Sequence, residues 1–160
     1  MDEAQRRVMT QFAQAIIEGN TTAAHRLLAP WLQRAVTPDE LAAVFERGRI
    51  ADAPAPARIF DLGLSSAVDY ATLTEASGPH ASLASYAHGD ELDPEIGMEG
   101  PPCFALDPAL DDDNFRGWGV LDLGPPDGDE CGLDFVLRLS IALAEVDGKL
   151  CIGHVEPELT

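Results

Sequence analysis

Apolar residues near the start of the chain recur every three or four positions, which is the spacing of one face of an α-helix. This pattern covers residues 3–18 and ends at a Gly-Asn pair, where we expect the first helix to stop. A second helix is expected over residues 21–29, because Pro30 cannot continue it without a kink. The segment Thr-Pro-Asp-Glu at residues 37–40 has the hydroxyl, first-turn proline and glutamate of a capping box, and predicts a third helix over residues 38–47.

The pattern changes after a Pro- and Ala-rich stretch at residues 51–57, which we interpret as an extended connector. Beyond it the helical spacing disappears and short segments rich in β-branched and aromatic residues follow, separated by Gly, Ser and Pro. We expect short strands within residues 57–64, 66–73, 81–86 and 115–124.

The clearest strand signal lies near the end of the chain. In residues 133–143 every second residue is large and apolar, so one face of this strand is predicted to be buried. Asp147 and Gly148 both tolerate positive φ and therefore predict a two-residue hairpin turn. The final strand is expected to run from Lys149 to about Glu156.

The hairpin turn also predicts how these two strands pair. Pairing the residues on either side of the turn sets Leu143 opposite Ile152 and Ile141 opposite His154. Directly opposite residues lie on the same face of a sheet. His154 is therefore expected on the apolar face.

The order of these elements, helices first and antiparallel strands afterwards, predicts an α+β fold. A chain of 160 residues is the usual size of one domain. We therefore expect a single domain over residues 1–160, in which three N-terminal helices pack on an antiparallel sheet that ends in a long β-hairpin. Its parts are a helical part (3–48), a connector (51–57) and a sheet part (58–156) with long acidic loops around 88–114 and 124–132.

The net charge of −18 is not spread evenly along the chain. Residues 1–58 hold seven arginines and seven acids, whereas the remaining residues hold three cations and 21 acids. This excess opposes binding to nucleic acid or to an anionic membrane and favours a protein partner with a basic surface. The expected acidic partner surface comprises Asp111, Asp112, Asp113, Asp127, Asp129 and Glu130.

The chain shows no signature of a metal, a cofactor or a disulfide framework. Its three cysteines are an odd number without CxxC spacing, which favours a reducing cytoplasm. The acidic runs do not match a calcium-binding EF-hand, and the common hydrolase, phosphate-binding and dinucleotide motifs are missing. The first residues carry acids and arginines instead of a long apolar run, so neither a signal peptide nor a transmembrane helix is expected there.

Candidate chemistry centres on His154, because an imidazole on a strand face can act as an acid, a base or a hydrogen-bonding group for a ligand. Asp122 is a candidate companion acid, and Tyr70 a candidate oxyanion donor. Trp31 and Trp118 are candidates for an aromatic pocket wall. The alternative for each is structural: a histidine bonded to a neighbouring carboxylate, and aromatic residues that belong to the core.

Three segments, FAQAIIEGNTTAAHRLLAPWL, TPDELAAVFERG and LRLSIALAEVDGKLCIGHVEPE, resemble the nuclear transport factor 2-like superfamily. The last of them is similar to the closing strand of many small bacterial members. The resemblance implies a strongly bent, cone-shaped sheet, a pocket between that sheet and the helices, and frequent dimerisation through the outer face of the sheet. It does not imply one function, because members include isomerases, dehydratases, oxygenase subunits, transport adaptors and immunity proteins.

Two functional hypotheses follow. The first is a non-catalytic cytoplasmic binding domain, immunity-like, that engages a basic protein partner through its acidic loops. The second is a small-molecule enzyme of the isomerase or dehydratase kind, or a ligand carrier, that uses the pocket between sheet and helices. The second requires an open pocket onto which His154 faces, whereas a pocket filled by Leu, Phe and Trp side chains excludes it.

Overall fold

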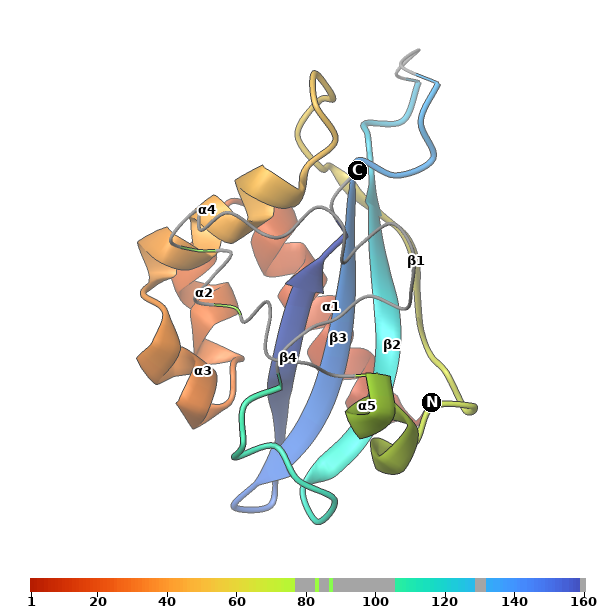
Figure 1. Cartoon of the computed structure of the whole chain (residues 1–160). Coiled ribbons are helices and arrows are strands. Elements are labelled where there is room, and N and C mark those ends of the chain that lie inside the picture. The colour runs from red at the N-terminus through yellow and green to blue at the C-terminus, as the bar shows by residue number, and fades with distance from the viewer. Residues whose placement is uncertain (77–82, 84–86, 88–105, 129–131, 159–160) are drawn as a thin grey trace.

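The computed structural model describes residues 1–76, 83, 87, 106–128 and 132–158 of the chain, and it has the α+β organisation that the sequence predicts (Figure 1). In chain order its elements are α1 (Glu3–Ile17), α2 (Thr21–Arg26), α3 (Pro30–Ala35), α4 (Pro38–Gly48), β1 (Arg58–Leu64), α5 (Tyr70–Ala76), β2 (Phe115–Gly124), β3 (Leu137–Val146) and β4 (Lys149–Pro157). The prediction of three helices is wrong, because the described residues contain five.

The two additional helices begin at local signals that compete with the pattern of apolar residues. Pro30 does not end a helix but begins α3. Proline is tolerated at the first helical position because the backbone N–H that it lacks would have no partner within the helix. The strand expected within residues 66–73 is replaced by α5. There the Asp69 carboxylate accepts hydrogen bonds from the backbone N–H and the hydroxyl of Thr72, both at 2.8 Å, and caps the helix. These bonds lower the pKa of Asp69, and they favour a helix start over an extended strand.

The capping box predicted at residues 37–40 is present. The Thr37 hydroxyl accepts a hydrogen bond from the backbone N–H of Glu40, and the Glu40 carboxylate accepts one from the backbone N–H of Thr37. A second capping box, formed by Asp2 and Gln5, starts α1. Both boxes satisfy backbone donors that the first helical turn leaves unpaired.

The four strands form one antiparallel sheet in the order β1-β2-β3-β4, so each strand pairs with its neighbour in the chain and the sheet is not closed. The cone-like bend stays a prediction. Of the strand expected near residues 81–86 the structure describes only Leu83, which is helical and buried, so the expectation is wrong at that residue. Residues 88–105 and 129–131 of the expected acidic loops also lie outside them.

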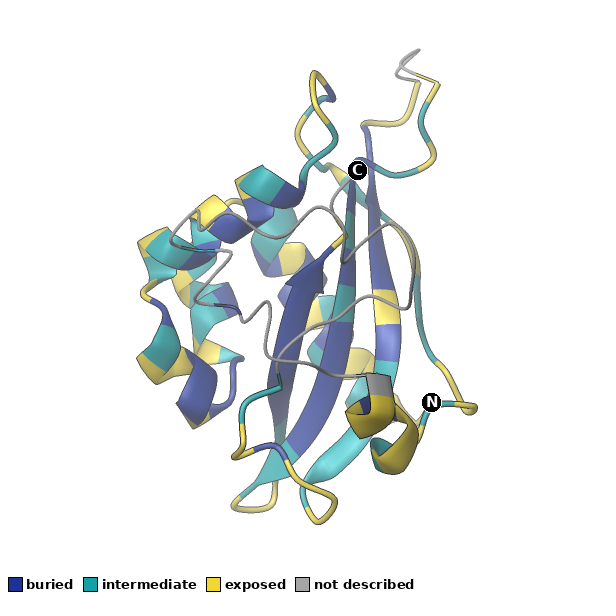
Figure 2. Cartoon of the chain, viewed as in Figure 1, coloured by how far each residue is buried: buried dark blue, intermediate teal, exposed yellow. Residues whose placement is uncertain are grey.

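One face of the sheet, called the inner face here, carries most of the large apolar side chains of the strands and packs against α1 and α4. In Figure 2 most of β3 and β4 has the colour of buried residues. Leu121, Leu139, Ile141, Leu143 and Ile152 on this face are all fully buried. They belong to one core cluster with Met9, Phe12 and Ala13 of α1 and with Leu41, Val44 and Phe45 of α4. The rings of Phe12 and Phe45 meet edge to face, with centroids 5.9 Å apart.

The two edges of the sheet differ. The outer edge of β4 is covered by the turn between α2 and α3: the backbone N–H of Ala29 donates to the Ile152 carbonyl, and the N–H of Ile152 donates to the Leu27 carbonyl, both at 2.8 Å. The Trp31 indole adds a hydrogen bond to the Gly153 carbonyl at 3.0 Å. No strand pairs with the outer side of β1 in the part of the chain that the structure describes.

Candidate functional site

The predicted pairing of the hairpin is correct near its turn and wrong beyond it. Leu143 does lie opposite Ile152, but a β-bulge shifts the register between Ala142 and Leu143. His154 consequently lies opposite Ala142 instead of Ile141. An extra residue in one strand reverses the faces of all residues after it. His154 therefore lies on the opposite face of the sheet, called the polar face here, and not on the apolar inner face.

On the polar face His154 is held between an aromatic ring and a carboxylate. The Trp118 indole stacks on the imidazole, with centroids 5.7 Å apart and an interplanar angle of 26°. Ala142 of β3 lies directly opposite Trp118 on one side and directly opposite His154 on the other. Its small side chain leaves room for the two rings to meet above it. The Glu156 carboxylate lies 3.8 Å from Nε2 of His154, two residues further along the same strand.

A second buried polar pair lies on the same face. Arg138 of β3 is directly opposite Asp122 of β2 and donates two hydrogen bonds to its carboxylate, at 2.7 and 3.0 Å. The bond to Asp122 raises the pKa of Arg138. Arg138 also lies 3.5 Å from the Glu158 carboxylate and covers the ring of Phe135 at 3.9 Å. Asp122 is thus neutralised by its own cation instead of serving His154 as a companion acid.

The remaining pocket candidates lie apart from this cluster. Trp31 is buried at the outer edge of β4, where its indole N–H is already bonded to backbone. The Tyr70 hydroxyl donates to the Leu110 carbonyl at 3.0 Å, and its ring packs against Phe115 with centroids 5.9 Å apart. The structure therefore brings His154 and Trp118 together but gives Asp122, Trp31 and Tyr70 separate structural contacts.

Among the described residues, buried apolar side chains lie between the sheet and helices α1 and α4. The apolar side chains of the inner face and those of α1 and α4 form one continuous core. His154 is only 3% exposed and points away from this space. At this exposure His154 offers a dissolved substrate almost no surface to contact. The ligand pocket between sheet and helices stays a prediction.

The polar face does hold a shallow groove of about 330 Å³ beside β1. It is lined by Asp61, Gly63, Leu64, Ser65, Val68, Trp118, Gly119 and Val120. Val120 is 38% exposed there and is one of three exposed large apolar residues among those that the structure describes. Sequence reasoning did not predict this groove, because it depends on which residues of β1 lie beside which residues of β2.

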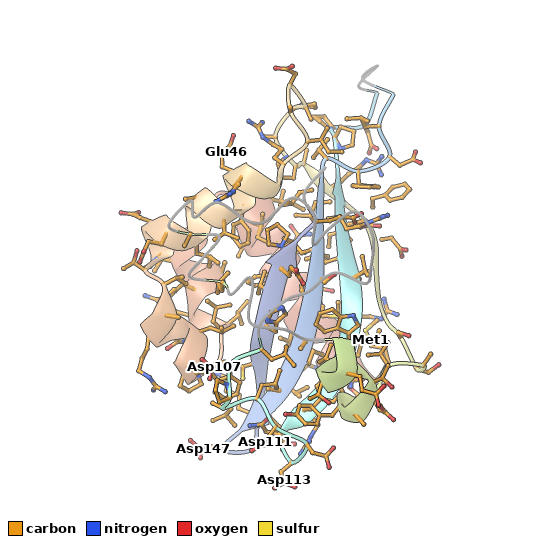
Figure 3. All side chains as sticks on the ribbon, in the orientation of Figure 1. Met1, Glu46, Asp107, Asp111, Asp113 and Asp147 are labelled. Carbon is orange, nitrogen blue, oxygen red and sulfur yellow. The ribbon has the colours of Figure 1, made fainter. Side chains whose placement is uncertain are left out.

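The described members of the expected acidic surface do not form one patch. Asp111, Asp112 and Asp113 precede β2 and are exposed at one end of the sheet, near the β3–β4 turn (Figure 3). Asp127 follows β2 at the other end, where it pairs with Arg58 at 3.1 Å. Ten strand residues span about 33 Å, which separates the two groups. Asp129 and Glu130 lie outside the described residues.

Among the described residues no three His, Cys, Asp or Glu side chains converge in a way that could hold a metal ion. No described helix is both long and apolar enough to cross a membrane. No protein-family model matches the chain, and no curated protein or solved structure shows a significant match to it.

Cys151 is expected to react slowly with thiol reagents in the folded protein. Its burial raises the pKa of the thiol to about 11, so at pH 8 only about one molecule in a thousand carries the reactive thiolate. In a Cys103→Ser/Cys131→Ser variant, labelling with a chromogenic disulfide at pH 8 should be at least about 100-fold slower than for the same variant unfolded in urea. Equal rates in the two states would contradict this assignment.

Proposed function

We propose that this protein is a non-catalytic binding domain that engages a protein partner through a basic surface on that partner. The observation that carries the proposal is the exposure of the acidic end of the sheet, which we define as the exposed Asp111, Asp112, Asp113 and Asp147 together with the half-buried Asp107 (Figure 3). A concentrated negative potential raises the association rate of a basic partner.

The local structure supports a fixed, outward presentation of these acids. The Asp111 carboxylate accepts a hydrogen bond from the backbone N–H of Asn114, and the Asn114 side chain accepts one from the N–H of Asp111, both at 2.9 Å. Arg116, the nearest arginine in the sequence, pairs with Glu145 at 2.9 Å and also donates a hydrogen bond to the backbone carbonyl of Asp113 at 2.8 Å. One cation therefore lies at this turn, and the three exposed aspartates leave it with a net negative charge.

The arrangement of the candidate chemistry favours binding over catalysis. The Asp122 carboxylate is engaged by Arg138, the His154 ring is stacked on Trp118, and the helix–sheet interface is a packed core. We include in this proposal the cytoplasmic location that the cysteine pattern favours and the kinship with the nuclear transport factor 2-like superfamily that the sequence resemblance implies. An immunity-like role is one of several functions that this superfamily holds. A homodimer through the sheet is an additional expectation from that resemblance.

The test is a pull-down from a lysate of the source cells with the wild-type chain and with an Asp111→Asn/Asp112→Asn/Asp113→Asn variant. Asparagine keeps the side-chain oxygen that caps the turn and removes only the charge. We expect a partner whose affinity falls about tenfold in the variant, because three screened surface contacts are lost, and which is also released by raised salt.

A matched control, Glu18→Gln/Asp52→Asn/Glu75→Gln, removes the same number of charges from exposed positions elsewhere. It should retain the partner. If the wild type, the variant and the control capture the same proteins, the acidic end is not the binding surface and the proposal is wrong.

A further inference from the structure

In the part of the chain that the structure describes, no strand pairs with the outer side of β1, which lies next to the groove of the polar face. Ser65 directs its backbone N–H toward β2, where it donates to the Trp118 carbonyl at 2.8 Å. The backbone N–H and C=O groups of successive residues in a strand point to opposite sides of that strand. The N–H and C=O groups of Leu62 and Leu64 therefore point away from β2. The opposite edge of the sheet, at β4, is covered by the α2–α3 turn. Among the described elements, β1 is therefore the strand that offers an unpaired row of donors and acceptors.

The groove beside this edge has one acidic and one apolar side. Asp61 is exposed and lies directly opposite Asp122 in the pairing of β1 with β2. Arg138 neutralises Asp122, and Arg58 is paired with Asp127, so in the described residues no cation pairs with Asp61. The apolar side consists of Val120 and the half-buried Trp118.

A glycine keeps the groove open. A Cβ atom added at Gly63 would meet nothing within 4 Å, and the φ angle there is not one that excludes side chains. A strand added outside β1 would lie about 4.8 Å away and would place every second side chain beside Asp61 and Gly63. An arginine or lysine at such a position reaches the Asp61 carboxylate while its aliphatic stem lies over Gly63 toward the indole.

We propose that β1 is a docking edge for an extended basic segment of a partner protein, which adds as a fifth strand and places a cationic side chain in the Asp61–Trp118 groove. The choice of a basic occupant rests on the proposed function. Charge complementarity favours it over a second copy, because two chains of net charge −18 repel each other.

The test is a titration of the ¹⁵N-labelled full chain with a capped peptide of about nine residues that alternates arginine and valine, at about 0.15 M salt. We expect chemical shift changes at the amides of Leu62 and Leu64 and at the indole N–H of Trp118. Asp61→Asn should weaken the affinity about three- to fivefold, as expected for one partly exposed ion pair, whereas Glu75→Gln should leave it unchanged. Methylating every backbone nitrogen of the peptide should weaken binding at least about tenfold, because strand pairing needs those N–H groups.

Several results would overturn this inference. Unchanged binding of the methylated peptide would exclude strand addition, and shift changes confined to residues 111–113 and 147–148 would place the peptide at the acidic end. No shift change at millimolar peptide would exclude a basic occupant. A dimer in sedimentation of the unliganded chain, with β1 amides protected from hydrogen exchange, would show that a second copy occupies the edge. The Asp111→Asn/Asp112→Asn/Asp113→Asn variant should still bind the peptide at β1, so failure of the acidic-end proposal is distinguishable from failure of this one.

Discussion

Replacing Gly119 with alanine is expected to lower the free energy of unfolding by about 3 kcal/mol or more. An alanine Cβ at this position would lie 1.9 Å from the carbonyl oxygen of Gly63 and 2.9 Å from the Cα atom of Leu64. These are backbone atoms of β1, so they cannot rotate away as a side chain can. The β1–β2 pairing has to open locally, and the groove beside β1 changes shape with it.

Gly63→Ala is the matched control, because it adds the same methyl group in the facing strand. The Cβ at Gly63 meets nothing within 4 Å, so its free energy of unfolding should stay within about 0.5 kcal/mol of the wild type. Urea denaturation of the three proteins, followed by circular dichroism, measures both differences. Equal stability of the two variants would show that the close approach of β1 to Gly119 is not required.

The second large effect is expected for Asp122→Ala, with a loss of about 2 kcal/mol in the free energy of unfolding. Asp122 is buried and receives two hydrogen bonds from Arg138, and removing one partner leaves an uncompensated charge. Breaking fully buried pairs costs about 3–5 kcal/mol; we expect less here because a third of the Arg138 side chain reaches solvent and Glu158 lies within 3.5 Å.

Two further variants identify the cause of that loss. Asp127→Ala breaks the pair with Arg58, in which the Asp127 side chain is 93% exposed, and should change the stability by less than about 0.5 kcal/mol. Asp122→Leu combined with Arg138→Met removes both charges and should recover most of the stability, because the desolvation cost of both ions disappears. A loss for Asp122→Ala no larger than that for Asp127→Ala, in the same urea denaturation assay, would contradict a structural role for this pair.

The fold class follows from the sequence because its signals are local. The apolar period over residues 3–18, the capping box at Thr37 and Glu40, and the Asp147–Gly148 turn each act within a few residues. Physical interactions at that range do not depend on the rest of the chain. The same reasoning failed at residues 66–73, where the Asp69 cap outweighed the weak strand propensity of the segment.

The candidate site was only partly predictable for a related reason. His154 and Trp118 were both singled out as pocket residues, and they do touch. They meet because each of them lies directly opposite Ala142, in the strands on either side of β3. The bulge near Gly153 decides that His154, and not another residue of β4, lies opposite Ala142. Arg138 was missed as a partner of Asp122, although the alternation of its strand places it on the face opposite to the apolar residues. Glu156 follows His154 by two residues and therefore shares its face, so the bulge moves both to the polar face.

The distribution of negative charge depends partly on the sequence and partly on the tertiary structure. Counting acids along the chain is sufficient to place the excess of negative charge in residues 59–160 and to oppose binding to nucleic acid. The strand expected over residues 115–124 already implies that Asp111–Asp113 and Asp127 lie at opposite ends of the sheet, as β2 places them. Only the tertiary structure pairs Asp127 with Arg58, because β1 and β2 are neighbours in the sheet. Secondary structure here depends on neighbours in sequence, whereas the site depends on register between strands, and register is decided by contacts across the sheet.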